Sequence, residues 1–236
     1  MNEGIQKAKE RLRDLADKER ARNLERYFKT GKGEYAEGDI FLGIRVPEIR
    51  KFVKELRGFH PAWAYQLLKS KYHEERLLSL LVLVDIFKRG DEKDKKKIYL
   101  HYLKNTRHIN NWDLVDLSAP NIVGAYLLDR DKKPIYRLAE SNNLWERRIA
   151  IIATLYLIRH CLFDDTLNIA RMLLQDKEDL IHKAVGWMLR EVGKRNREVE
   201  ENFLKDHYKL MPRVMLRYSI ERFPEKKRQM YLKGKI

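Results

Sequence analysis

Hydrophobic residues recur at helical spacing along most of the chain. The most apolar stretches are 77–87 (LLSLLVLVDIF) and 149–158 (IAIIATLYLI). In 149–158 the apolar side chains continue all the way around a helix, which predicts a helix buried between its neighbours. Pro47 and Asp131 mark predicted helix starts. Because the connections between such segments are short, the pattern predicts an all-α fold of packed helical pairs.

Both apolar stretches are shorter than the ~18 to 20 residues that a membrane-spanning helix needs, so we expect no association with a membrane. Residues 1–15 contain no apolar signal core, which favours a cytoplasmic protein. Cys161 is the single cysteine, so an intrachain disulfide is excluded and a reducing compartment is favoured. The seven histidines form no HxxxH pair, and we expect neither a metal ion nor a cofactor.

The chain also shows internal similarity. Segment 74–83 (EERLLSLLVL) aligns without a gap with 146–155 (ERRIAIIATL), a displacement of 72 residues or two steps of 36. Segment 182–191 (HKAVGWMLRE) follows the same pattern a further 35 residues on. A repeating helical unit of this length is typical of an α-solenoid of the HEAT kind. We therefore predict one HEAT-like-repeat domain over residues 1–236.

Six chemically notable residues fall on this repeat. The alignment places at equivalent helix positions Arg76, Trp112, Arg148 and Lys183, and one turn further on Asp116 and Trp187. Equivalent helices of a solenoid line its concave face, so these side chains predict a basic groove that bears aromatic rings.

One segment departs from the helical pattern. Residues 30–44 (TGKGEYAEGDIFLGI) contain four of the eleven glycines. Glycine permits positive φ, so the segment predicts a loop or a short hairpin that turns at residues 36–38. The Gly-Lys-Gly at 31–33 lacks the GxxxxGK[ST] pattern and no strand precedes it, which disfavours a nucleotide site.

The net charge of the chain indicates what kind of molecule it binds. The 236 residues include 50 Lys and Arg against 35 Asp and Glu, a formal net charge of +15. Such a surplus attracts polyanions, and nucleic acid is the commonest. The alternative explanation of this composition is the enrichment in Lys and Glu that heat-adapted proteins show. That enrichment is usually near-balanced in sign, so it leaves the surplus unexplained.

The residues themselves suggest chemistry at four places, two of which lie in the middle of the chain. Trp112 and Asp116 are spaced i, i+4 on one helix face, and Asp116 stands among apolar residues. An ion pair between Asp116 and the next helix is the alternative to a functional carboxylate. Arg147 and Arg148 point about 100° apart, so one of them can grip a phosphate in the groove. An ordinary surface arginine is the alternative.

Two features near the C-terminus complete the set. Gly186 precedes Trp187 inside a predicted helix, which indicates close approach of either a packed helix or a ligand. Residues 212–236 predict a short helix with Arg213 and Arg217, followed by a basic tail at 224–236. This end is expected to contact a nucleic-acid backbone.

Five segments resemble one known family. They are RYFKTG…FLGIRVPEIRK (26–51), NNWDLVD (110–116), LWERRIAI (144–151), KAVGWMLRE (183–191) and PRVMLRYSIERFPEKKR (212–228). On these segments the chain resembles the HEAT-like-repeat alkylpurine DNA glycosylases of the AlkD type. NNWDLVD and KAVGWMLRE are its specific motifs. The family's active-site positions match Tyr27, Trp112, Asp116, Arg148 and Trp187.

The resemblance implies a monofunctional DNA glycosylase without a cofactor. Its substrate would be a cationic N3- or N7-alkylated purine in duplex DNA, and its reaction hydrolysis of the N-glycosidic bond. Asp116 would stabilise the cation that develops on the deoxyribose and position the water, and Trp112 and Trp187 would pack on that sugar. The phosphate backbone would be held by Arg148, with Lys183, Arg190, Arg213 and Arg217. In that family the damaged base is reported to stay near the stack. We expect a monomer that is nucleoid-associated when bound to DNA.

Segment 30–44 keeps a second function open. The compact catalytic members enter the FLGI segment more directly, whereas some relatives thought to bind branched DNA without glycosylase activity carry a β-hairpin there. The alternative is thus a non-catalytic HEAT-repeat protein that binds branched or distorted DNA through a 30–44 hairpin. A protein-interaction scaffold is a third possibility, because such arrays are often adaptors.

Overall fold

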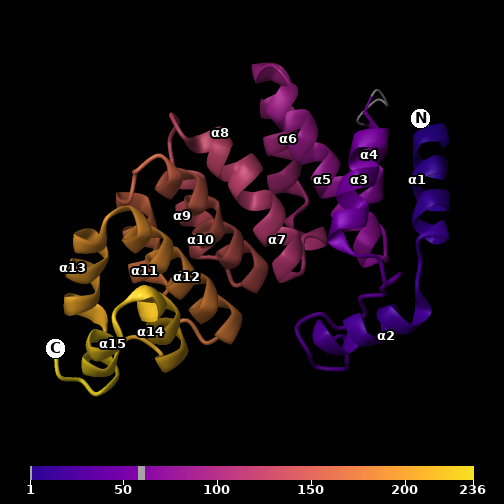
Figure 1. Cartoon of the computed structure of the whole chain (residues 1–236). Coiled ribbons are helices and arrows are strands. Elements are labelled where there is room, and N and C mark those ends of the chain that lie inside the picture. The colour runs from indigo at the N-terminus through magenta and orange to yellow at the C-terminus, as the bar shows by residue number, and fades with distance from the viewer. Residues whose placement is uncertain (1, 58–61) are drawn as a thin grey trace. The chain divides into compact units, whose positions relative to one another are not determined.

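The computed structural model describes residues 2–57 and 62–236, with side chains from residue 5 onward (Figure 1). This part of the chain is helical, and its only β-type pairing is one parallel bridge between Ile40 and Tyr72. The expected all-α, HEAT-like repeat fold is confirmed. None of the helices in the described ranges is long and apolar enough to cross a membrane.

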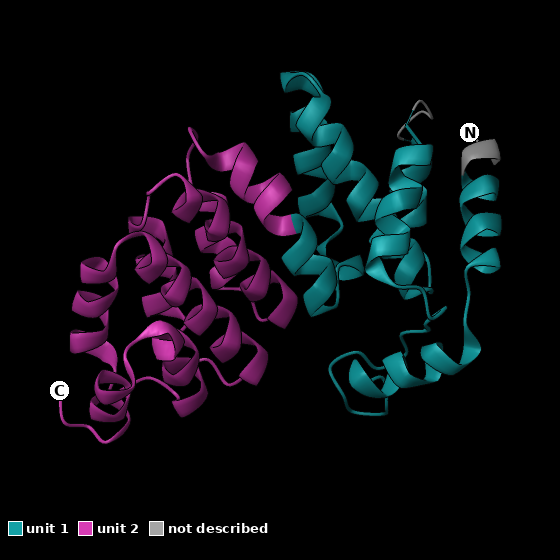
Figure 2. Ribbon diagram, in the orientation of Figure 1, with its two compact units in different colours: residues 1–118 teal, residues 119–236 magenta. Residues whose placement is uncertain are grey.

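The chain forms two compact units, Met1–Ser118 and Ala119–Ile236 (Figure 2). Each has its own buried core. That all 236 residues act as one repeat domain stays a prediction.

Unit 1 is organised around a buried helix. Its helices are α1 (Asn2–Asp14), α2 (Lys18–Tyr27), α3 (Val46–Glu55), α4 (Ala62–Leu67), α5 (His73–Arg89), α6 (Glu92–Lys104), the short η1 (Thr106–His108) and α7 (Trp112–Ala119), whose last residue belongs to unit 2. Helix α5 packs against α1, α3, α4 and α6. Leu78, Leu80 and Leu83 of α5 are fully buried, so the apolar stretch at 77–87 forms the core of this unit.

Unit 2 stacks its helices in the same way. Its elements are η2 (Pro120–Gly124), α8 (Ala125–Leu127), α9 (Lys133–Ala139), α10 (Leu144–Arg159), α11 (Asp164–Met172), α12 (Asp179–Arg195), α13 (Arg197–His207), α14 (Arg213–Ser219), η3 (Ile220–Arg222) and α15 (Glu225–Leu232). Helix α10 packs against α9, α11 and α12, and α12 against α13 and α14. Five consecutive residues of α10, Ile149 to Ala153, are fully buried. The prediction of a helix enclosed on all sides is confirmed.

A recurring loop contact defines the repeat. In three loops a Ser or Asp side chain accepts a hydrogen bond from the backbone N–H two residues on, and a basic side chain six positions on donates to its carbonyl. The pairs are Ser70 with Arg76, Ser141 with Arg147 and Asp176 with His182. These contacts fix where each following helix begins. The first two loops are 71 residues apart, so Arg76 corresponds to Arg147.

The expected register was therefore wrong by one residue at Arg76. Counted from the first helical residue, the fifth position of α5, α7, α10 and α12 is held by Leu77, Asp116, Arg148 and Lys183. Arg148 and Lys183 are equivalent, as expected. Trp112, in contrast, is the first residue of α7. A continuous apolar run tolerates a one-residue slip in an alignment, whereas the polar loop contacts do not.

Gly186 is explained by a packed helix. A Cβ atom at this position would lie 2.4 Å from the Met215 carbonyl oxygen of α14. Gly124 meets α10 in the same way, with a Cβ position 2.1 Å from the Ala153 carbonyl oxygen. Of the two explanations offered for Gly186, the close approach of a helix accounts for it.

The glycine-rich segment 30–44 is a loop of successive turns, and the hairpin alternative is wrong. Three of its glycines, at 33, 38 and 43, have positive φ. Ile40 pairs with Tyr72 instead of with its own segment. The Glu74 carboxylate also accepts hydrogen bonds from three consecutive backbone N–H groups, at residues 42–44. The loop is folded onto α5 because its backbone groups find their partners there.

The basic C-terminal segment 224–236 carries more structure than charge alone implied. It contains α15, in which the Tyr231 ring is buried edge-on against Tyr208 and Phe223. The Tyr208 hydroxyl donates to the Ile236 carbonyl at 3.0 Å. Hydrophobic contacts therefore anchor this segment to unit 2.

Candidate functional site

Four rings of unit 1 form an aromatic column that begins at Trp112. Phe28 stacks on Trp112 with centroids 5.0 Å apart, and Phe41 stacks on Phe28 at 4.9 Å. The imidazole of His73 stacks on Phe41 at 4.4 Å. Tyr27 lies edge-on to Phe28 and to Trp112. Stacked and edge-to-face pairs of this kind are favourable beyond the area they bury, so the column fixes the Trp112 ring to α2 and to the glycine-rich loop.

A buried charge network lies at the far end of the column. Asp39 accepts a hydrogen bond from Arg76 at 2.7 Å and longer ones from Asn110 and Asn111. The two ring nitrogens of His73 face Asp113 at 2.8 Å and Asp39 at 3.5 Å. The network thus joins the loop (Asp39), α5 and the first turn of α7. Two carboxylates balance two cations, as burial of charge requires.

The network shifts the acidities of its members. Burial alone would lower the pKa of His73, but the charge of Asp113 and hydrogen bonds with Asp113 and Asp39 raise this pKa to about 9. Burial alone would raise the pKa of Asp39, but the hydrogen bond from His73 and the charge of Arg76 hold that pKa below its usual value. His73 is therefore an imidazolium at neutral pH.

This charge state predicts a pH dependence of stability. The pKa of His73 is higher in the folded protein than in an unfolded chain, so its stabilisation is complete below about pH 6.5 and is lost as the pH rises through about 9. We expect the free energy of unfolding to fall by up to about 3 kcal/mol across this range. In the His73→Gln variant this fall with rising pH should be absent. Chemical denaturation at several pH values measures it.

The control for this prediction is the exposed His160, because His160→Gln keeps the network. Burial also raises the pKa of Glu200, to about 8. Both variants retain Glu200, so their difference isolates His73. Equal pH slopes in His73→Gln and His160→Gln would contradict the assignment.

The first turn of α7 is held from two sides. Asn111 Oδ1 accepts a hydrogen bond from the Trp112 backbone N–H at 2.8 Å. Burial raises the pKa of Tyr35, and the interaction of Tyr35 with the Trp112 side chain offsets only part of this rise. Asn111 therefore holds the backbone of Trp112, and Phe41 of the glycine-rich loop belongs to the column that holds its ring.

The column borders a cavity of about 550 Å³, which we call the aromatic cavity. It lies wholly within unit 1, between α2, the glycine-rich loop, α3, α5 and α7. The residues that matter for its chemistry are Leu24, Tyr27, Phe28, Phe41, Trp112 and Asp116. Three predicted site residues, Tyr27, Trp112 and Asp116, therefore share one cavity. The Asp116 side chain is only partly buried, on a wall that is otherwise mostly apolar.

Three further predicted residues lie on neighbouring helices of unit 2. Arg148 is 5% exposed and donates to the Leu180 carbonyl at the start of α12. Lys183, at the equivalent position, is 39% exposed and pairs with Asp179. The partly buried Trp187 donates from its indole N–H to Glu191 at 3.0 Å. Lys183 is thus the more accessible cation of this helix position.

The remaining predicted DNA contacts differ in accessibility. Arg190 is mostly buried and forms an ion pair with Glu221. Arg213 is exposed and donates to the Leu232 carbonyl, which ties α14 to α15. Arg217 is exposed on α14. Of these three residues, Arg217 is the best placed to meet a phosphate.

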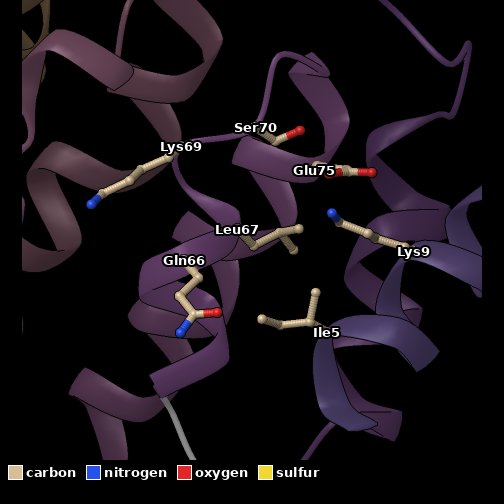
Figure 3. A pocket seen from close by; sticks show the side chains of 7 residues that line it. All are labelled: Ile5, Lys9, Gln66, Leu67, Lys69, Ser70 and Glu75. Carbon is tan, nitrogen blue, oxygen red and sulfur yellow. The ribbon is translucent and has the colours of Figure 1, made fainter. Parts of the chain in front are cut away.

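A second, more polar cleft of about 360 Å³ lies beside α1 and α4 (Figure 3). The ammonium group of Lys9 points toward the buried Glu75 there. Glu75 Oε2 has no hydrogen-bond partner within the described residues. None of the predicted site residues lines this cleft.

Sequence reasoning did not anticipate Phe28, Phe41, His73 and Asp39. Phe28 directly follows Tyr27, and His73 precedes the acidic pair at the start of α5, but neither position reveals its partners. Asp39 and His73 are 34 residues apart, and only the folded loop brings them together. The sequence feature that could have pointed to this network was Asp39, a carboxylate within a glycine-rich segment.

Comparison with known proteins assigns the family. A family model described as "DNA alkylation repair enzyme" matches residues 8–223. The chain belongs to this family. No curated protein matches this chain.

Solved structures are similar to this DNA alkylation repair family member in fold. A predicted DNA alkylation repair enzyme from Enterococcus faecalis has a TM-score of 0.68 at 18% identity, with 89% of this chain and 98% of that chain covered. AlkD2 from Streptococcus mutans has a TM-score of 0.55 at 17% identity, with 88% and 99% covered. These likenesses support the all-α repeat fold.

Proposed function

We propose that this family member is a monofunctional DNA glycosylase that removes cationic N3- or N7-alkylated purines from duplex DNA. The observation that carries the proposal is the partly buried carboxylate of Asp116 in the aromatic cavity, next to Trp112 and Tyr27. A carboxylate in apolar surroundings interacts strongly with a positive charge because little water screens it.

The reaction needs little acid catalysis. The alkylated purine is already a cation, so when the N-glycosidic bond breaks it leaves with the bonding electron pair as a neutral base. Positive charge then develops on the deoxyribose, where Asp116 stabilises it. A water molecule adds its oxygen to C1′ and loses a proton to Asp116 or to solvent. The products are a free base and an abasic site in an unbroken strand.

Residues of unit 2 supply DNA contacts in this proposal. Trp187 packs on the sugar backbone, and Lys183 and Arg217 contact phosphates, because both cations are accessible. As the family resemblance implies, we also assign backbone contacts to Arg148, which is 5% exposed, and to Arg190 and Arg213. The net charge of +15 favours a polyanionic partner.

The test is base release from methylated duplex DNA. Purified wild-type protein is expected to liberate 7-methylguanine or 3-methyladenine while the strand stays intact until alkali is added. Failure to release any alkylated base overturns the proposal.

DNA binding is expected to weaken steeply with salt. Each phosphate contact contributes about −0.9 to the slope of log affinity against log salt concentration. The Arg217→Ala variant should reduce the magnitude of that slope by about 0.9, independent of DNA sequence. Fluorescence anisotropy at several salt concentrations measures it. Lys97, which is exposed on α6, is the matched control, and an equal loss in Lys97→Ala would contradict a specific contact at Arg217.

Branched-DNA binding is the runner-up function. The wedge that it required was a hairpin at 30–44, and that segment is a loop anchored to α5. Gel shifts compare four-way junctions with plain duplex. The glycosylase proposal expects no strong junction preference.

A further inference from the structure

We propose that the glycine-rich loop supports the carboxylate of the proposed glycosylase, with Asp39 of the loop and His73 of α5 acting as positioning residues for Asp116. The inference rests on the proposed function and deepens it, because it names two residues on which the placement of that carboxylate depends. It also gives a role to segment 30–44, the part of the chain that departs from the helical pattern.

One chain of hydrogen bonds runs from the loop to the backbone of Trp112. Asp39 is 8% exposed, and its carboxylate accepts hydrogen bonds from the side-chain amides of Asn110 at 3.3 Å and Asn111 at 3.4 Å. The carbonyl oxygen of the fully buried Asn111 side chain then accepts from the Trp112 backbone N–H at 2.8 Å. Asp39 therefore orients the side chain that holds the start of α7.

A second chain reaches the same turn through His73. Its imidazole lies 3.5 Å from Asp39 and donates a hydrogen bond to Asp113 at 2.8 Å. The Asp113 carboxylate also accepts from the Leu114 backbone N–H at 2.8 Å. Both chains end in the first turn of α7, and Asp116 follows one turn further on. A shift of the first turn therefore moves the Asp116 carboxylate with it.

The proposed reaction depends on this placement. The attraction between Asp116 and the cation that develops on the deoxyribose varies with their separation, and in apolar surroundings little water screens the difference. Misplacement of a reacting group by about 1 Å can cost about 100-fold in rate. The aromatic column holds the ring of Trp112, whereas the two hydrogen-bond chains hold the backbone that carries Asp116. Loss of either chain should therefore affect the rate of base release more than the affinity for DNA.

The charges of the network make this support dependent on pH. The charged groups that face His73 are Asp113 from α7, Asp39 from the loop and Arg76 from its own helix, and two aromatic rings of the column pack against the imidazole. When His73 loses its proton at about pH 9, the two carboxylates keep only Arg76 as a cation. The network then buries an excess negative charge, which is unfavourable, and its hold on α7 weakens.

The first experiment removes the charge of Asp39. Asp39→Asn keeps the size of the side chain, and we expect single-turnover release of 7-methylguanine to be about 10- to 100-fold slower while binding of duplex DNA is unchanged. Glu37→Gln, at an exposed position of the same loop, retains an acceptor for the Gly33 backbone N–H and should keep the wild-type rate. Circular dichroism checks that both variants are folded in the assay. A wild-type rate in Asp39→Asn overturns the proposal.

A double-mutant cycle tests whether Asp39 acts through Asp116. In the Asp116→Asn background no carboxylate is left to be placed, so the addition of Asp39→Asn should slow base release no further. A residue that only stabilises the fold would cause the same fold-loss in both backgrounds. Losses that add in full would therefore contradict a positioning role.

The pH profile of base release provides a readout for His73. Release by the wild type, after subtraction of spontaneous release without protein, should fall as the pH rises through about 9. His73→Gln should be slower at neutral pH and lack this fall, whereas the exposed His160→Gln should keep both the rate and the fall. The folded fraction is measured at each pH. A fall of equal size in His73→Gln counts against the proposal.

The two proposals can fail separately. If the wild type releases base and Asp39→Asn does so equally fast, the positioning role fails and the glycosylase function stands. If the wild type releases none, the function fails, and hydrogen exchange of the backbone amides of residues 112–116 tests the positioning alone. Faster exchange in Asp39→Asn than in Glu37→Gln supports the hold of the loop on α7, and equal exchange overturns it.

Discussion

The Asp116→Asn variant is expected to release 7-methylguanine from methylated duplex DNA about 100-fold more slowly than the wild type, or slower still. Asparagine keeps the size and shape of the side chain but carries no charge. The lost term is the attraction between the carboxylate and the cationic sugar in a cavity with mostly apolar walls. Single-turnover base release with enzyme in excess measures the chemical step without product release.

Two controls separate chemistry from binding. Asp116→Asn should bind duplex DNA as tightly as the wild type or slightly tighter, because a negative charge near a polyanion is removed. Asp94→Asn, at an exposed acidic position on α6, should retain the wild-type rate. Base release by Asp116→Asn at the wild-type rate would refute the mechanism.

The Gly43→Ala variant is expected to lose about 3 to 5 kcal/mol of unfolding free energy. A Cβ atom at this position would lie 2.1 Å from the Asp17 carbonyl oxygen and 2.7 Å from the Ala21 nitrogen. Both atoms belong to the backbone around the start of α2, so neither can turn away. The residue also has φ near +83°, which an L side chain disfavours. Urea denaturation followed by circular dichroism measures the loss.

Gly38 provides a matched control in the same loop. Its φ of +82° is almost the same, but a Cβ atom there would meet nothing within 4 Å. Gly38→Ala should therefore cost only the conformational part, about 1 to 2 kcal/mol. The difference between the variants isolates the close approach of the loop to α2. Equal losses would show that backbone conformation alone explains Gly43.

Much of the fold could be predicted because helical burial leaves a local signal. The apolar residues of 149–158 point to every side of a helix, which only an enclosed helix does. The repeat register was harder to predict, because leucine-rich helices align nearly as well when shifted by one residue. The polar loop contacts of Ser70, Ser141 and Asp176 fix the register, and they became visible only with their partners.

The candidate site, like the fold, could be predicted from the sequence only in part. Trp112 and Asp116 stand one turn apart on one helix, so their shared position in the aromatic cavity followed from spacing. The column that orients Trp112 could not be predicted, because Phe28, Phe41 and His73 come from separate segments. The burial of Arg148 could not be predicted from its sequence position. Its side chain is 5% exposed and donates to the Leu180 carbonyl, a partner 32 residues away.

The Asp39 network also bears on how unit 1 folds. Asp39 bonds to Asn111, 72 residues later, and His73 bonds to Asp113 across 40 residues. Bringing such distant residues together costs loop entropy before any contact repays it. Individual helices such as α5 can form early from local contacts, but the cavity closes only when the loop, α5 and α7 have all met. We therefore expect the candidate site of unit 1 to form late in folding, and partly folded chains to lack it even when they are already helical.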